Sequence, residues 1–83
     1  MIMAWHAYLL KCADGSLYAG ATNDVARRVA AHAAGKGAKY TRGRCPIALV
    51  WKRRVKDRSA ALKLEARLKR MTRKEKLALA GAD

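Results

Sequence analysis

The short length of the chain is the feature that most constrains its fold. With 83 residues, it can bury only about 60–65% of its extended surface, so its hydrophobic core must be thin. We therefore expect a single domain over residues 1–83, with a shallow surface groove rather than a deep enclosed pocket. Such a groove suits a polymeric substrate better than a small metabolite. Hydrophobic residues make up 52% of the chain, which argues against disorder.

A large excess of positive charge is the second constraint. Nineteen Lys and Arg residues against six Asp and Glu residues give a formal net charge of +13. So much charge on a small surface attracts polyanions, and nucleic acid is the expected partner. A basic but inert surface is the alternative. No stretch is both long and apolar enough to favour a membrane partner, and no hydrophobic patch predicts an oligomer.

The start of the chain and the cysteines indicate a cytoplasmic protein. The opening segment, up to Trp5, has neither a charged start nor a long apolar stretch, so no signal peptide is expected. Cys12 and Cys45 stand apart, without the spacing of a structural zinc site. We expect two partly buried thiols in a reducing cytoplasm.

The patterns of apolar and capping residues predict an α+β fold with the order β-β-α-β-α-α and a small, mainly antiparallel three-stranded sheet flanked by helices. Strands are expected at 5–12, 16–20 and 47–55. The first helix begins after Thr22, Asn23 or Asp24 and ends at Ala34, before Gly35; the second runs from Asp57 or Ser59 to Met71; the third runs from the capping box of Thr72 and Glu75 to Gly81.

The loop of the expected hairpin decides where its two tyrosines point. A two-residue loop at 14–15 would place Tyr8 and Tyr18 on opposite faces. A three-residue loop at 13–15, with its glycine in the left-handed conformation, would pair Tyr18 with Leu10 and place both tyrosines on one face. We predict the three-residue loop. Two half-buried aromatic rings that only stiffen the hairpin are the alternative to a functional pair.

The first expected helix separates its two arginines. Arg28 and His32 lie four residues apart at one edge of the apolar sector, where they can face a groove beside the sheet, whereas Arg27 points toward solvent. An ordinary surface histidine is the alternative for His32. The apolar sector holds Ala26, Val29, Ala30 and Ala33.

The second expected helix carries an acidic residue without an obvious structural role. Glu65 lies at the edge of the buried stripe. The other internal acids are explained by a turn or a helix cap. An exposed ion pair with Lys69 is one interpretation of Glu65, and a ligand for a hard divalent cation is the other. The buried stripe consists of Ala61, Leu64, Leu68 and Met71.

Together these segments resemble the GIY-YIG nuclease superfamily. The matching residues, in order, are His6-Ala7-Tyr8, Tyr18-Ala19-Gly20, Arg28, His32 and Glu65. The segments KGAKYTR (36–42), DRSAA (57–61) and KRMTRKEK (69–76) resemble its small stand-alone branch of uncharacterised, UPF0213-like proteins. The resemblance covers almost the entire chain. Two features depart from the pattern: His6-Ala7 replaces the glycine and isoleucine of the family's name, and no asparagine follows Glu65.

The resemblance implies a role for each of these residues in phosphodiester hydrolysis. Tyr8 corresponds to the general base for the attacking water, and Tyr18 positions that water or the phosphate. Arg28 stabilises the charge that develops on the phosphate, and His32 assists by hydrogen bonding. Glu65 is the protein ligand of a single Mg²⁺ or Mn²⁺ ion. Because a tyrosine has an ordinary pKa of about 10, we expect a neighbouring cation to lower the pKa of Tyr8.

Residues around this site are expected to bind nucleic acid. The backbone at Gly20 would approach the substrate closely. A solvated charge run is the alternative for the basic loop. Trp5 and Trp51 are interpreted as core or sheet-face residues rather than base-stacking platforms. The loop residues expected to contact phosphates, with Tyr40 able to stack on a base, are Lys36, Lys39, Tyr40, Thr41, Arg42 and Arg44.

The leading hypothesis is a metal-dependent endonuclease of low sequence specificity, with DNA favoured over RNA and branched or flapped DNA as candidate substrates. A non-catalytic nucleic-acid-binding module is the second hypothesis. A nuclease subunit that needs a partner protein for its specificity is the third.

Overall fold

A computed structural model describes residues 4–81, apart from the side chain of Tyr40. The chain forms a three-stranded sheet in the order β2-β1-β3, and both strand pairs are antiparallel. The predicted α+β fold is therefore confirmed. The strands are β1 (Trp5–Lys11), β2 (Leu17–Thr22) and β3 (Ala48–Val55).

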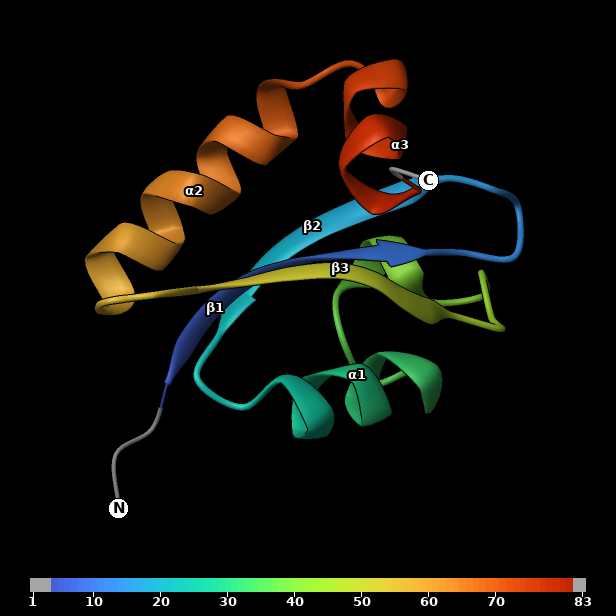
Figure 1. Cartoon of the computed structure of the whole chain (residues 1–83). Helices are drawn as coiled ribbons and strands as arrows, with labels where there is room; N and C mark the ends of the chain where they lie inside the picture. Colours follow the sequence, from blue (N-terminus) through green and yellow to red (C-terminus); the bar gives the residue numbers. More distant parts are fainter. Residues whose placement is uncertain (1–3, 82–83) are drawn as a thin grey trace.

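The helices cover both faces of this sheet. Helix α1 (Val25–Ala33) lies on one face, and helices α2 (Arg58–Arg70) and α3 (Arg73–Ala80) lie on the other (Figure 1). The caps follow from local sequence: Asp24 and Asp57 accept hydrogen bonds from the first turns of α1 and α2, and Thr72 and Glu75 form the predicted capping box of α3. The basic loop also contains a 3₁₀ turn, η1 (Lys39–Thr41), which was not predicted.

The hairpin between β1 and β2 has the predicted three-residue loop. The backbone N–H of Cys12 donates to the oxygen of Ser16 at 2.9 Å, and Gly15 has a φ of 83°, in the left-handed region. The resulting register pairs Leu10 with Tyr18. Tyr8 and Tyr18 therefore lie on the same face of the sheet, as expected.

Asp14 has the turn role that the sequence assigns to it. Its carboxylate accepts hydrogen bonds from the backbone N–H of Ser16 at 3.0 Å and from the Ser16 hydroxyl at 2.6 Å. These bonds, together with the guanidinium of Arg44, hold the pKa of Asp14 at about 2. The ionised carboxylate thus fixes the loop that sets the hairpin register.

The two faces of β1 have different environments because alternate side chains point to opposite sides. Ala7 and Leu9 face α2 and form the hydrophobic core with Ala19 and Leu68, which are all at most 2% exposed. Tyr8 points to the opposite face, where α1 lies. The partly buried hydrophobic residues packed against the core are Val50, Trp51, Leu64, Met71 and Leu79.

The expectation of two partly buried thiols is wrong, because the two cysteines lie in opposite environments. Cys12 is buried and Cys45 is exposed, and both are free. None of the helices within residues 4–81 has the length and hydrophobicity that crossing a membrane requires.

The packing of α2 gives the first prediction. Leu68 is 1% exposed in the core, whereas Leu62, on the same helix, is 44% exposed. Leu68→Ala should lower the free energy of unfolding by about 2–5 kcal/mol because it leaves a cavity. Leu62→Ala should change it by less than about 1 kcal/mol. Urea denaturation of both variants measures the difference, and equal losses would contradict the assignment of the core.

Candidate active site

Tyr8 occupies the centre of the sheet face beneath α1. It lies on the middle strand and its side chain is 1% exposed. Its cross-strand partner is Gly20. A Cβ atom at Gly20 would overlap the hydroxyl end of the phenol ring. The structural reason for this glycine is therefore the space that Tyr8 occupies, which is a different reason from the expected approach of a substrate.

His32 reaches from α1 to this tyrosine. Its imidazole is fully buried, and Nε2 lies 3.2 Å from the Tyr8 hydroxyl. The ring of Tyr18 is 5.3 Å from the imidazole, centroid to centroid. The interpretation of His32 as a surface histidine is therefore wrong. The expected inner face of α1 is also wrong, because the helix buries His32, whereas Ala26, Ala30 and Ala33 are exposed.

The far side of the imidazole is held by the basic loop. Nδ1 of His32 lies 2.8 Å from the hydroxyl of Thr41, which donates to the backbone oxygen of Ala38 at 2.9 Å. Thr41 is fully buried. A Cβ atom at Gly37 would overlap the imidazole, so this glycine leaves the space for it. Neither contact was anticipated from the sequence, because both depend on how the loop folds back over α1.

The electrostatics of Tyr8 differ from the expectation. Burial raises the pKa of Tyr8 above its ordinary value, and the neighbouring Arg28 guanidinium offsets this only in part. The charges of Tyr18 and Glu65 raise the pKa of Tyr8 further. Arg28 thus lowers the pKa of Tyr8 as expected, but burial has the larger effect, and the net pKa is raised instead of lowered. Arg28, Tyr18 and Glu65 thus all lie within electrostatic reach of the phenol.

Glu65 forms the ion pair with Lys69 that its position suggested. Its side chain is 18% exposed and forms an ion pair with the ammonium of Lys69 at 2.9 Å. The pKa of Lys69 is raised, chiefly by its hydrogen bond to Glu65. Helix α2 packs against β1 and β2, and this packing brings the Glu65 carboxylate within electrostatic reach of Tyr8. The acid therefore has a cationic partner and also borders the site.

A surface hollow adjoins these residues at the start of α1. It has a volume of about 380 Å³, and its walls include both Arg27 and Arg28. Arg28 therefore borders the hollow and also lies near Tyr8. The remaining lining residues are Thr22, Asn23, Asp24 and Ala31.

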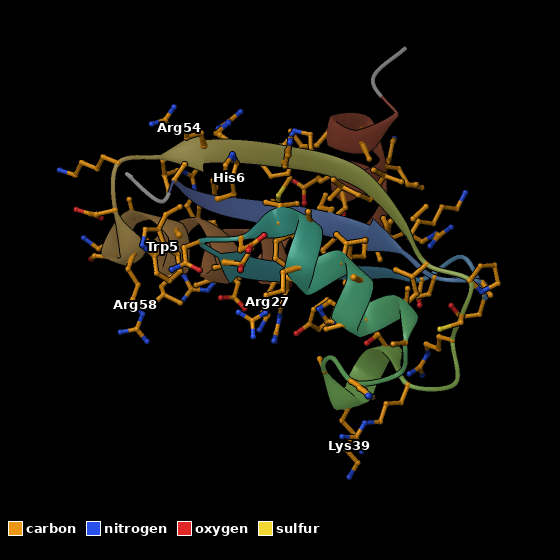
Figure 2. The ribbon with its side chains drawn as sticks, turned by 90° about the horizontal axis from the view of Figure 1, so that it is seen from below. Trp5, His6, Arg27, Lys39, Arg54 and Arg58 are labelled. Atoms are coloured by element: carbon orange, nitrogen blue, oxygen red, sulfur yellow. The ribbon has the colours of Figure 1, made fainter. Side chains whose placement is uncertain are left out.

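The predicted phosphate-binding residues of the basic loop fall into different environments. Lys36, Lys39 and Arg42 are exposed, and Lys39 extends away from the sheet (Figure 2). Arg44 forms an ion pair with Asp14 at 3.1 Å. The burial of Thr41 does not fit the predicted contact with a phosphate. The side chain of Tyr40 lies outside the described part of the structure.

Comparison with known proteins identifies the arrangement. The model of the GIY-YIG catalytic domain matches residues 4–78. The chain belongs to the GIY-YIG family. This membership confirms the resemblance to the family, whereas the roles of Tyr8, Tyr18, Arg28, His32 and Glu65 stay predictions. It places the chain among nuclease domains, whose substrate is nucleic acid and which generally use divalent metal ions.

The relatives of this GIY-YIG chain include UPF0213 proteins of Yersinia pestis and Yersinia pseudotuberculosis. Each is 54% identical over 72 residues, which cover 87% of this chain and 76% of the relative. The solution structure of the UPF0213 protein of Bacillus halodurans is 43% identical and has a TM-score of 0.60, covering 98% of this chain and 86% of that one. A protein of E. faecalis has the same identity and TM-score, with coverages of 88% and 78%.

The buried imidazole gives the second prediction. Burial, with a smaller effect of Arg28, lowers the pKa of His32 below its ordinary value of 6.5. The unfolded state therefore takes up a proton at a higher pH than the folded state does. The free energy of unfolding should fall as the pH drops from about 7 to about 5.5.

Urea denaturation across this pH range measures the effect. His32→Asn should flatten the dependence, whereas His6→Asn, which changes the other histidine, should leave it in place. A His32→Asn variant with the full wild-type dependence would contradict the assignment.

Proposed function

We propose that the chain is a metal-dependent endonuclease that hydrolyses phosphodiester bonds of nucleic acid, with DNA favoured over RNA and with low sequence specificity. The observation that supports this most directly is the buried contact between Tyr8 and His32. It brings a phenol and an imidazole together, within electrostatic reach of a guanidinium and a carboxylate. A fold that needed only a basic surface would not require a buried polar pair here, since such groups are costly to bury unless each finds a partner.

Tyr8 would act as the base without first ionising. Its raised pKa keeps the phenol protonated at neutral pH. When its oxygen takes a proton from water, the proton it already carries can move to Nε2 of His32, 3.2 Å away. Hydroxide and imidazolium then form together, so the net charge of the site does not change. His32 would be the terminal proton acceptor in this step.

Arg28 and Tyr18 would hold the phosphate for attack. Arg28 lines the surface hollow and also interacts with Tyr8, so a phosphate bound in the hollow would meet its guanidinium. A planar guanidinium suits two phosphate oxygens and stabilises the charge that develops on them. The Tyr18 ring lies against His32 on the same face, where it can help to position the water or the phosphate.

Glu65 would hold the divalent ion, Mg²⁺ or Mn²⁺. Within residues 4–81, no group of three or more His, Cys, Asp or Glu side chains could hold a metal. One carboxylate nevertheless fits Mg²⁺, which keeps several waters and completes its shell with substrate phosphates. When bound, the ion would supply positive charge that polarises the phosphodiester. Lys69 would have to release Glu65, its partner at 2.9 Å.

The rest of the surface suits a nucleic-acid backbone. The net charge of +13 attracts a polyanion. Lys39 and Arg54 extend on opposite sides of α1 (Figure 2), so basic side chains flank the site in two directions. A strand that passes the site can therefore be gripped before and after the scissile bond. Binding should weaken as the salt concentration rises, because bound phosphates release counterions.

The ion pair between Glu65 and Lys69 favours a second candidate, a non-catalytic nucleic-acid-binding module. In that case the carboxylate serves only to fix Lys69 on α2. The two candidates differ in what the loss of the Glu65 charge does. A nuclease should stop cutting but still bind, whereas a binding module should bind as well or better.

Cleavage of end-labelled single-stranded, duplex, flap and branched DNA, with matched RNA, tests the proposal. In Mg²⁺ or Mn²⁺, Tyr8→Phe and Glu65→Gln should each lower the cleavage rate by about 100-fold or more. Both variants should retain salt-sensitive binding. A chelator should stop cleavage by the wild-type chain.

Glu75→Gln is the matched control, because Glu75 lies in the exposed capping box of α3. It removes the same charge and should cut like the wild type, since glutamine also supports a capping box. Tight binding without cleavage of any substrate would contradict the proposal that the chain alone is an active nuclease. Equal cleavage by the Glu65 and Glu75 variants would remove the metal-binding role.

A further inference from the structure

We infer that Thr41 is a positioning residue that fixes the tautomer of His32 and thereby turns Tyr8 into an acceptor toward the site. The inference deepens the proposed function and rests on it for its catalytic consequence. It stands on a series of hydrogen-bond contacts that runs from Tyr8 through His32 and Thr41 to the backbone oxygen of Ala38, and both contacts of His32 are buried.

The donor and acceptor in each of these hydrogen bonds follow from the number of protons that the groups carry. A backbone oxygen only accepts, so the Thr41 hydroxyl donates its single proton to the oxygen of Ala38 at 2.9 Å. The Thr41 oxygen must then accept from Nδ1 of His32 at 2.8 Å. A neutral imidazole carries one proton, so Nε2 has a free lone pair. The Tyr8 hydroxyl therefore donates to Nε2.

The opposite tautomer, with the proton on Nε2, has a weaker hydrogen bond at Nδ1. The backbone N–H of Ala38 also faces Nδ1, and it could donate there if Nε2 carried the proton instead. That contact is 3.4 Å long, against 2.8 Å to Thr41. Hydrogen bonds of this type have a usual length of about 2.9–3.0 Å, so the shorter contact dominates. The Nδ1–H tautomer is the one that the geometry favours.

The surroundings keep the imidazole in this state. His32 and Thr41 are both fully buried, so water does not compete for Nδ1. Gly37 leaves the space into which the ring fits. The low pKa of His32 keeps the ring neutral near pH 7, and a tautomer is defined only for a neutral ring.

The tautomer decides what Tyr8 offers to a water molecule. With Nε2 as acceptor, the phenol proton points toward His32, and the lone pairs of the Tyr8 oxygen remain for a proton from water. With Nε2–H, the imidazole would occupy one of these lone pairs and the phenol would present its proton to the site. Only the first arrangement suits a base.

Nitrogen NMR of ¹⁵N-histidine-labelled protein at neutral pH tests the tautomer directly. Wild-type His32 should carry its proton on Nδ1, and Thr41→Val, which keeps the shape but cannot accept a hydrogen bond, should shift the proton toward Nε2. Thr41→Ser should retain the wild-type tautomer. A His6→Phe variant leaves His32 as the remaining histidine of the two and assigns the signals.

Cleavage assays test the consequence. Thr41→Val should lower the cleavage rate by about 10- to 100-fold, a part of what acid–base catalysis contributes. Thr41→Ser should restore cleavage to near the wild-type rate. Binding to the same DNA should stay unchanged in both variants, because the buried hydroxyl does not touch the substrate. A backbone NMR spectrum confirms that each variant is folded.

The outcomes separate this inference from the proposed function. An Nε2–H tautomer in the wild type overturns the inference, whatever the enzyme does. An unchanged tautomer and rate in a folded Thr41→Val variant overturn it as well. An Nδ1–H wild type whose tautomer shifts in Thr41→Val, found together with no cleavage of any substrate, supports the positioning by Thr41 and contradicts the nuclease instead.

Discussion

The buried hydrogen bonds of His32 are the interactions on which the rest of the site depends. They join three segments that are far apart in sequence: β1 through Tyr8, helix α1, and the basic loop through Thr41. Burying an imidazole and a hydroxyl is costly unless each finds a partner, and here both do. The same contacts that satisfy these groups also aim Tyr8, so the packing of this face and the geometry of the site are one arrangement.

In this small chain, one face of the sheet holds the hydrophobic core and the other face holds the site. The face toward α2 holds the apolar core around Leu9 and Leu68. The opposite face gives its space to polar rings, and Gly20 and Gly37 make room for them where any side chain would collide. Because β1 is the central strand, its alternating residues serve the core and the site in turn. The loop fixed by Asp14 keeps Tyr18 in register with this division.

Local chemistry explains what could be predicted from the sequence. The caps and the three-residue hairpin loop depend on neighbouring residues alone. Thr72 and the loop were predicted, and Asp24 and Asp57 were among the candidate caps. The inner face of α1 was not predicted, because small alanines define a helical face weakly, whereas the bonds of His32 come from distant segments. Thr41 was misplaced among surface residues for the same reason. The effect of burial on Tyr8 also needs the folded structure, since adjacent cations alone suggest the opposite sign.

In the proposed reaction, this site makes water attack a phosphodiester. The most direct measurement is cleavage of DNA in oxygen-18 water, followed by mass spectrometry of the terminal phosphates that the cuts create. The account predicts oxygen-18 in each new phosphate with the wild-type chain, and no new labelled ends with Tyr8→Phe, which keeps the ring but loses the hydroxyl that contacts His32. Labelled ends at equal rates from both proteins, or bound DNA that never acquires the label, would contradict it.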